Sequence, residues 1–191
     1  MMVIGMVFLY GNCECILATS QPVFHAFFLA ILIYRGFRFG RKRSLKVTHA
    51  TIHGLAFVFS LFGLIAVFDS HNYAVPKIPN LYSLHSWIGL AAIILFVCQY
   101  VMGFVCYLFP MLREPFRIFY MPIHVFCGLA GYVLALAAAL MGLSEKAFFA
   151  MKDYSQMPSQ GLLINCIGML LALFGTLVMY MVTEPRYDNF H

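Results

Sequence analysis

Charged residues are scarce in this chain, and their scarcity excludes most classes of soluble protein. Only 10% of the 191 residues are Asp, Glu, Lys or Arg, whereas 63% are hydrophobic. The mean hydropathy of +0.88 is far above that of a soluble globular domain. The chain also lacks a low-complexity tract, an internal repeat and the basic start of a secretory signal peptide. These features indicate an integral membrane protein with one domain over residues 1–191.

Five apolar segments account for most of the sequence. They cover residues 1–34, 48–68, 82–109, 118–143 and 160–183. Each of the last four is long enough for a helix to cross a hydrocarbon core of about 30 Å. We therefore expect an all-α bundle of about five transmembrane helices in a lipid bilayer.

Basic residues set the expected orientation of these helices. The gap after the first segment holds half of all Lys and Arg, so the positive-inside rule places it in the cytosol. Its basic residues are Arg35, Arg38, Arg41, Lys42, Arg43 and Lys46. Alternation then places the gaps 69–79 and 144–161 outside the cytosol or in a lumen, and returns the gap with Arg113 and Arg117 to the cytosol. Because topology explains the net charge of +5, we expect no nucleic-acid partner.

Three histidines each stand near the start of a different apolar segment. His49 lies in KVTHATIHGLAF, His85 in NLYSLHSWIGL and His124 in YMPIHVFCGLAG. An ionisable side chain inside a membrane span is costly and marks a functional site by default. The alternation above puts His49 and His124 at one cytosolic depth, whereas His85 lies near the opposite face. This placement suits His49 and His124 as the two axial ligands of one haem iron, although hydrogen-bonded interfacial histidines are the alternative.

A fourth histidine, His53, follows His49 by one helical turn and lies on the same face. It is either an alternative ligand or a packing neighbour of His49, and we interpret it as the neighbour. His71 falls in the gap 69–79, where it is expected to be a surface or substrate-site residue.

Five sequence stretches follow one another in the order and spacing of a known membrane cytochrome family. They are KRSLKVTHATIHGLAF, GLIAVFDSHN, NLYSLHSWIGL, MPIHVFCGLAG and MGLSEKAFF, within residues 31–183. The chain thus resembles the cytochrome b561 family. The resemblance implies a six-helix architecture, two b-type haems, and electron transfer from cytosolic ascorbate to ferric iron or monodehydroascorbate on the other side. The expected location is the plasma membrane or an endosomal, lysosomal or secretory-vesicle membrane, and a homodimer is left open.

The resemblance also implies roles for particular residues. Positions matching His49 and His124 hold the cytosolic haem, and His85 is one ligand of the luminal haem. Four basic positions match residues associated with ascorbate binding in related proteins: Lys46, Lys42, Arg117 and Arg35. Pro122 is expected to mark the first turn of its helix, which would leave Arg117 in the preceding loop.

The acceptor site is expected on the luminal side near His85. Four residues are its expected lining: Phe68, His71, Asn80 and Tyr82. An aromatic interfacial belt with turn residues is the alternative interpretation of the same four positions.

Two departures from the family pattern concern the start of the chain. The His-Pro pair whose histidine partners the position of His85 would fall just before Met1, and CECILATSQPVFHAFFL reads as an insertion between GN and AILIYR. The first segment is therefore expected to be irregular. His25 would lie at mid-membrane, the wrong depth to replace the missing ligand. The sequence leads us to expect a truncated form with one firmly bound haem, at His49 and His124.

Two other functions stay open at this stage. A small transporter would also use intramembrane histidines, but it would more often carry acidic residues within its spans, and here only Glu14 lies inside one. The departures at the start of the chain suggest the other, an inactive haem-binding fragment.

Overall fold

The computed structural model describes residues 29–33, 36–37 and 41–184. Across these residues the chain forms α-helices and one short 3-10 helix, Tyr154–Gln156, and no strand. Most of the irregular first segment, including His25 and the proposed insertion, lies outside the described residues, as does Arg35.

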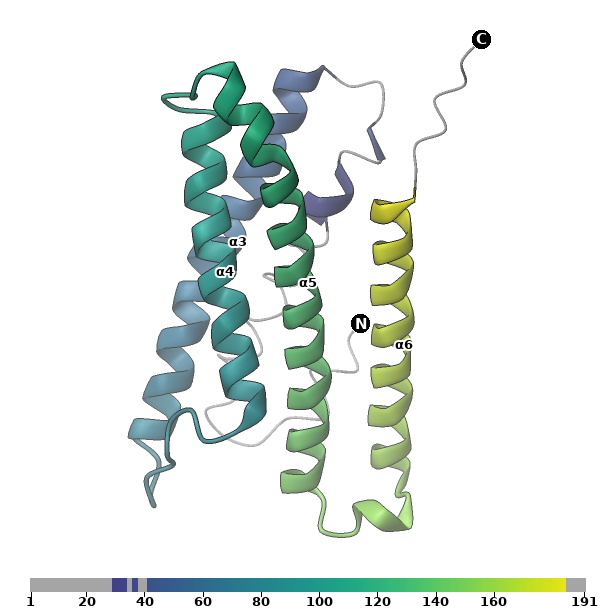
Figure 1. Cartoon of the computed structure of the whole chain (residues 1–191). Helices are drawn as coiled ribbons and strands as arrows, with labels where there is room; N and C mark the ends of the chain where they lie inside the picture. Colours follow the sequence, from purple (N-terminus) through teal and green to yellow (C-terminus); the bar gives the residue numbers. More distant parts are fainter. Residues whose placement is uncertain (1–28, 34–35, 38–40, 185–191) are drawn as a thin grey trace.

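Four long helices form the bundle. They are α3 (Lys42–Asn72), α4 (Leu84–Tyr107), α5 (Glu114–Ala150) and α6 (Ser159–Thr183). Each is long and apolar enough to cross a membrane. Consecutive helices run in opposite directions, so the starts of α3 and α5 and the ends of α4 and α6 lie at one end of the bundle (Figure 1). The prediction of an all-α membrane bundle is confirmed.

The boundaries of two predicted gaps differ in the structure, because α3 and α5 continue beyond their apolar segments. α3 extends to Asn72, so His71 lies in its last turn and not in a gap. α5 continues through Ser144–Ala150, in a stretch rich in the helix-forming residues Glu, Lys and Ala. Hydrophobic length reports the membrane core, whereas the backbone remains hydrogen-bonded for another turn or more in the interfacial region.

The start of α5 corrects a second expectation. The helix begins at Glu114, where an acidic residue in the first turn and Pro115 at the second position both favour helix initiation. Arg117 therefore lies in the first turn of α5 and not in a loop. Pro122 is inside the helix, where a proline removes one backbone hydrogen bond. Figure 1 shows the first turns of α5 leaning away from the axis of the rest, as a proline inside a helix favours.

α5 packs against α4 on one side and α6 on the other. Tyr132 of α5 is 1% exposed and donates its hydroxyl hydrogen to the carbonyl oxygen of Gly175 in α6 over 3.0 Å. Val178 is buried beside it. Because Gly175 has no side chain, Leu136 of α5 can approach the α6 backbone closely. Small residues at such contacts are the usual means by which membrane helices pack.

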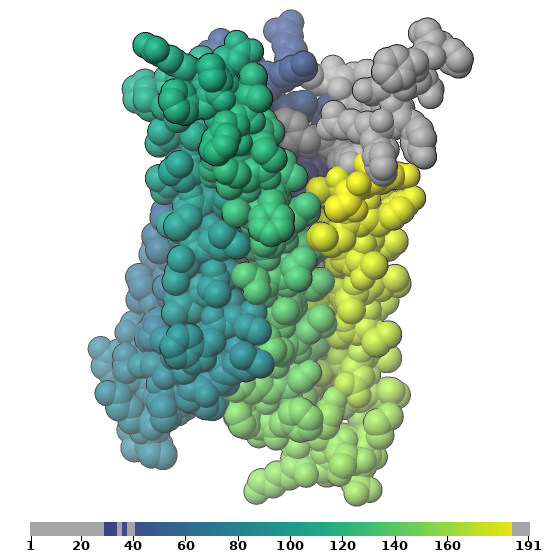
Figure 2. All heavy atoms as spheres, in the orientation of Figure 1, coloured from purple at the N-terminus to yellow at the C-terminus, as the bar shows by residue number. Residues whose placement is uncertain are grey.

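The outer surface of the bundle is apolar. Figure 2 shows α4, α5 and α6 exposed side by side on one face. Large side chains such as Phe126 and Met169 are each 72% exposed. Surface of this kind is stable against lipid tails, so the exposed apolar residues agree with a multi-pass membrane protein.

Candidate functional site

The structure brings the predicted pair His49 and His124 together. His49 projects from the second turn of α3 and His124 from α5, and their ring centres are 6.4 Å apart. Two imidazoles that bind one metal ion from opposite sides place their nitrogens about 2 Å from it, which separates the ring centres by about 6 Å. The observed spacing therefore suits a single iron atom between the two rings.

The hydrogen bond of His49 fixes which ring nitrogen would face a metal. His49 Nδ1 lies 2.8 Å from the carbonyl oxygen of Ala30. Because a carbonyl only accepts, Nδ1 must carry the hydrogen, and in the neutral ring the lone pair is then on Nε2. Metal-binding histidines are commonly oriented by such a bond from their other nitrogen.

His124 is enclosed by aromatic rings. The centres of Tyr107 and Tyr120 lie 5.7 Å and 5.8 Å from the His124 ring. On the α4 side a Cβ atom at Gly103 would lie only 3.0 Å from His124 Cε1, so a side chain there would crowd the His124 ring. His124 Nδ1 is buried and has no hydrogen-bond partner among the described residues. An orphaned buried nitrogen of this kind fits a ring whose partner is a bound group.

His53 differs from the pair in its distance to His49. Its ring centre is 4.5 Å from that of His49, with the planes at 81°. This spacing is too short for two rings on opposite sides of one iron. The His53 ring also contacts Phe96, at 5.5 Å between ring centres. The geometry thus favours the interpretation of His53 as a packing neighbour.

His85 lies at the opposite end of the bundle, in the first turn of α4. Its Nδ1 is 2.8 Å from the carbonyl oxygen of Ala138 in α5, so its lone pair is also on Nε2. A Cβ at Gly142 would lie 2.7 Å from His85 Cε1, which shows how closely the ring approaches the α5 backbone. His85 repeats the arrangement of His49 on a different pair of helices.

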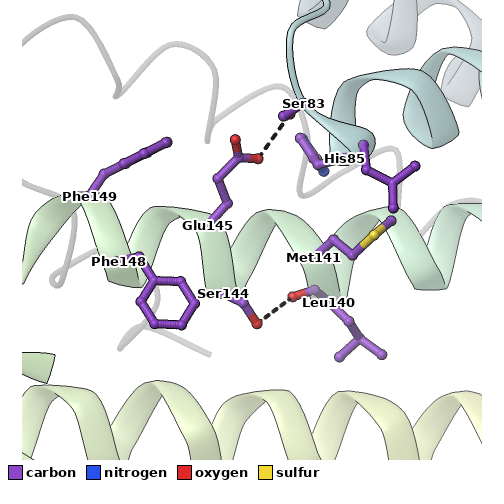
Figure 3. A pocket seen from close by; sticks show the side chains of 9 residues that line it. Ser83, His85, Leu140, Met141, Ser144, Glu145, Phe148 and Phe149 are labelled. Carbon is purple, nitrogen blue, oxygen red and sulfur yellow. Dashed lines mark hydrogen bonds between the residues drawn. The ribbon is translucent and has the colours of Figure 1, made fainter. Parts of the chain in front are cut away.

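An open groove of about 500 Å³ lies beside His85 (Figure 3). Nine residues line it: Ser83, which precedes α4, and eight residues of α4 and α5. Glu145 contributes a carboxylate to it and accepts a hydrogen bond from Ser83 Oγ over 3.1 Å. The Tyr82 hydroxyl lies close enough to the same carboxylate to be affected by its charge. Desolvation and the Glu145 carboxylate raise the pKa of the Tyr82 hydroxyl, so this hydroxyl remains a donor. Glu145 is a site residue that was not predicted from the sequence, although a carboxylate at the end of the apolar run in MGLSEKAFF is a detectable signal.

The four expected acceptor residues come from two parts of the structure. Tyr82 lies just before α4, near Glu145. Asn80 donates to the side chain of Asn72 over 3.0 Å, which ties the loop after α3 back to the end of that helix. Phe68 and His71 belong to the last turns of α3.

Basic side chains mark the end of the bundle that contains His49 and His124. Lys42 and Lys46 stand in the first two turns of α3, and Lys46 is half-buried. Arg117, in the first turn of α5, is also half-buried, and its carbonyl oxygen accepts a hydrogen bond from Tyr107 over 3.1 Å. The starts of α3 and α5 share one end of the bundle (Figure 1), so three of the four predicted donor-site residues do as well.

Residues 22–150 match the family model described as eukaryotic cytochrome b561. The chain belongs to this family. It is 42% identical to the plasma membrane ascorbate-dependent reductase CYBRD1 of Xenopus tropicalis. The 182 aligned residues cover 93% of this chain and 63% of that relative. It is 41% identical over 189 residues to the transmembrane ascorbate-dependent reductase CYB561 of Sus scrofa, over 98% of the chain and 68% of the relative. The lysosomal membrane ascorbate-dependent ferrireductase CYB561A3 of Bos taurus is 40% identical over 193 residues. This alignment covers 99% of this chain and 66% of that relative.

The cytochrome b561 family implies b-type haem, and the residues of this chain fit such a group. The His49 and His124 rings have a spacing that suits one iron. The buried Nδ1 of His124 has no other partner among the described residues, and Gly103 leaves room for its ring. A multi-pass membrane protein of this family therefore has a suitable haem-binding pair near one end of its bundle.

Proposed function

We propose that this protein carries electrons across a membrane from cytosolic ascorbate to an acceptor on the luminal or extracellular side, as a transmembrane ascorbate-dependent reductase. The single observation that supports it most is the pairing of His49 with His124 at 6.4 Å, which suits an axially ligated haem b. Haem iron supplies one-electron redox chemistry when it is bound. His85, at the other end of the bundle, is proposed as one ligand of a second haem near the acceptor, although the His-Pro pair that would supply the other ligand is not among residues 1–191.

The basic residues at the starts of α3 and α5 are proposed to bind the ascorbate monoanion. Positive charge raises the local concentration of an anionic donor near His49 and His124. The guanidinium of Arg117 offers a planar set of N–H donors to the donor's oxygens, and the hydrogen bond from Tyr107 holds the Arg117 backbone in place. Lys42 and Lys46 add charge on the neighbouring helix. Arg35 is proposed as a fourth member of this site.

The proposed acceptor is ferric iron or monodehydroascorbate. The relatives support this choice, because their names describe ascorbate-dependent reductases and a ferrireductase. Their names also support a plasma membrane or lysosomal membrane for this protein. Tyr82, with the neighbouring loop residue Asn80 and with Phe68 and His71 of α3, is proposed as the acceptor-side lining.

An absorption spectrum of the purified protein tests the haem. Addition of ascorbate should produce the sharp bands of a reduced b-type cytochrome, and their absence would overturn the proposal. Vesicles that contain the protein and are loaded with ascorbate then test transfer. They should reduce external ferric citrate, detected with a ferrous-specific chelator, whereas ascorbate-loaded vesicles without the protein should not.

A further inference from the structure

Glu145 is a half-buried carboxylate near the end of α5 that the proposed electron transfer does not use. An isolated carboxylate at the edge of a membrane span is costly unless it is hydrogen-bonded. Glu145 meets this requirement with a donor from the segment before α4, the Ser83 hydroxyl at 3.1 Å. Figure 3 shows its side chain directed toward Ser83, across the groove beside His85.

This donor belongs to the start of the helix that carries His85. Ser83 is the N-cap of α4, and its Oγ accepts a hydrogen bond from the backbone N–H of Ser86 over 3.3 Å. His85 lies between these two residues, in the turn that the cap closes. Glu145 therefore holds the capping side chain itself, and through it the first turn of α4.

One face of α5 contacts this turn at three successive levels. Ala138, Gly142 and Glu145 are spaced by four and three residues, so they lie on the same side of the helix. Ala138 accepts the hydrogen bond from the His85 ring, Gly142 lies against the ring, and Glu145 binds the turn that carries it. The ring and its backbone are thus fixed to the same helix face.

We propose that Glu145 is a positioning residue for His85: by accepting the hydrogen bond from Ser83, it fixes the start of α4 on α5 and so sets the orientation of the His85 ring. The consequence for electron transfer rests on the proposed role of His85 as a haem ligand. A misoriented ring would change the ligand field of that haem before it prevented binding.

The test compares three variants of the full chain. Glu145→Ala removes the acceptor, and Glu145→Gln keeps an oxygen that can accept from Ser83. Ser144→Ala is the matched control, because Ser144 lines the same groove but donates only to Leu140 of its own helix, over 3.1 Å. The readouts are electron paramagnetic resonance of the ferric low-spin haem and amide hydrogen exchange in the first turn of α4.

In Glu145→Ala, exchange in that turn should rise about fivefold, as expected from loss of one hydrogen bond. The haem signal that disappears in His85→Ala should shift, and the signal that depends on His49 should not. Glu145→Gln should restore most of both readouts, and Ser144→Ala should leave both unchanged.

Other outcomes overturn the proposal in distinguishable ways. Unchanged exchange and an unchanged haem signal in Glu145→Ala would show that Glu145 holds nothing. Faster exchange with an unchanged haem signal would reduce Glu145 to a helix cap without influence on the ring. If His85→Ala leaves every haem signal intact, the proposed ligand role of His85 is wrong. Amide exchange needs no haem, so faster exchange in Glu145→Ala would still support the contact between Glu145 and α4, and unchanged exchange would overturn it.

Discussion

His85 of α4 donates the hydrogen of its Nδ1 to the carbonyl oxygen of Ala138 in α5, over 2.8 Å. His49 makes the equivalent bond to Ala30, also over 2.8 Å. Both rings therefore carry the lone pair on Nε2 and are held by a backbone group that cannot rotate away. Two histidines at opposite ends of the bundle share the support that metal-binding histidines use, which is the physical basis for treating both as ligands.

Replacement of a ligand at the cytosolic end should remove the haem bound there. His49→Ala or His124→Ala takes away one of two axial ligands, so the site is weakened and the remaining iron would be five-coordinate. His53→Ala should keep a low-spin spectrum. The ring centre of His53 is only 4.5 Å from that of His49, which is too short for the two rings to bind one iron from opposite sides. Haem content and the absorption spectrum of each purified variant are the measurements. Loss of haem in His53→Ala together with retention in His49→Ala would show that the pairing is wrong.

The donor site should respond to loss of positive charge. Lys46→Ala and Arg117→Ala should each lower kcat/KM for ascorbate by roughly two- to fivefold, mainly through KM, because each removes one charge contact with the anion. The difference from the unmodified protein should shrink at high salt and with a neutral reductant. Lys152→Ala is the matched control, since Lys152 follows α5 at the opposite end of the bundle. An equal loss with both reductants would indicate misfolding instead of a lost binding charge.

The depth of the histidines could be predicted because hydrophobic length and charge position both report location in a membrane. The pairing of His49 with His124 followed from depth alone, and the 6.4 Å between their rings agrees with it. The contact between Glu145 and Ser83 could not be predicted in this way. These residues are 62 positions apart, and only the packing of α4 on α5 shows that they meet.

The ends of the helices also could not be predicted from the hydropathy pattern. His71 and Arg117 were assigned to gaps because hydropathy falls at these positions, but the helices continue there. Outside the hydrocarbon core water can satisfy either a helix or a loop, so local propensity and capping decide where a helix ends. Hydropathy therefore bounds the membrane core more accurately than it bounds the helix.

The contact between α5 and α6 should depend on one hydroxyl. Tyr132→Phe keeps the buried ring but removes the hydrogen bond to Gly175, at an expected cost of about 0.5–1.5 kcal/mol. For a chain of this size the melting temperature should fall by about 1–6 °C. Tyr180→Phe is the control, because Tyr180 is exposed and its hydroxyl, among the described residues, bonds to Glu184 one turn away in sequence. Thermal unfolding in detergent provides the comparison, and an equal shift in both variants would show that the interhelical bond has no special weight.

Gly142 should tolerate no side chain, because the His85 ring occupies the space where a Cβ would stand. A Cβ there would lie 2.7 Å from His85 Cε1 and 2.9 Å from Nδ1, so the ring in Gly142→Ala must move and lose its bond to Ala138. Helix propensity alone favours Ala over Gly by about 1 kcal/mol, so the sign of the effect distinguishes the two contributions. Gly168→Ala in α6 supplies the reference, since its nearest contact would be Leu143 at an ordinary 3.5 Å. Gly142→Ala should lower the melting temperature and shift the haem signal that depends on His85, whereas Gly168→Ala should be neutral or stabilising. A stabilised Gly142→Ala with an unchanged haem signal would mean that the His85 ring does not lie against α5.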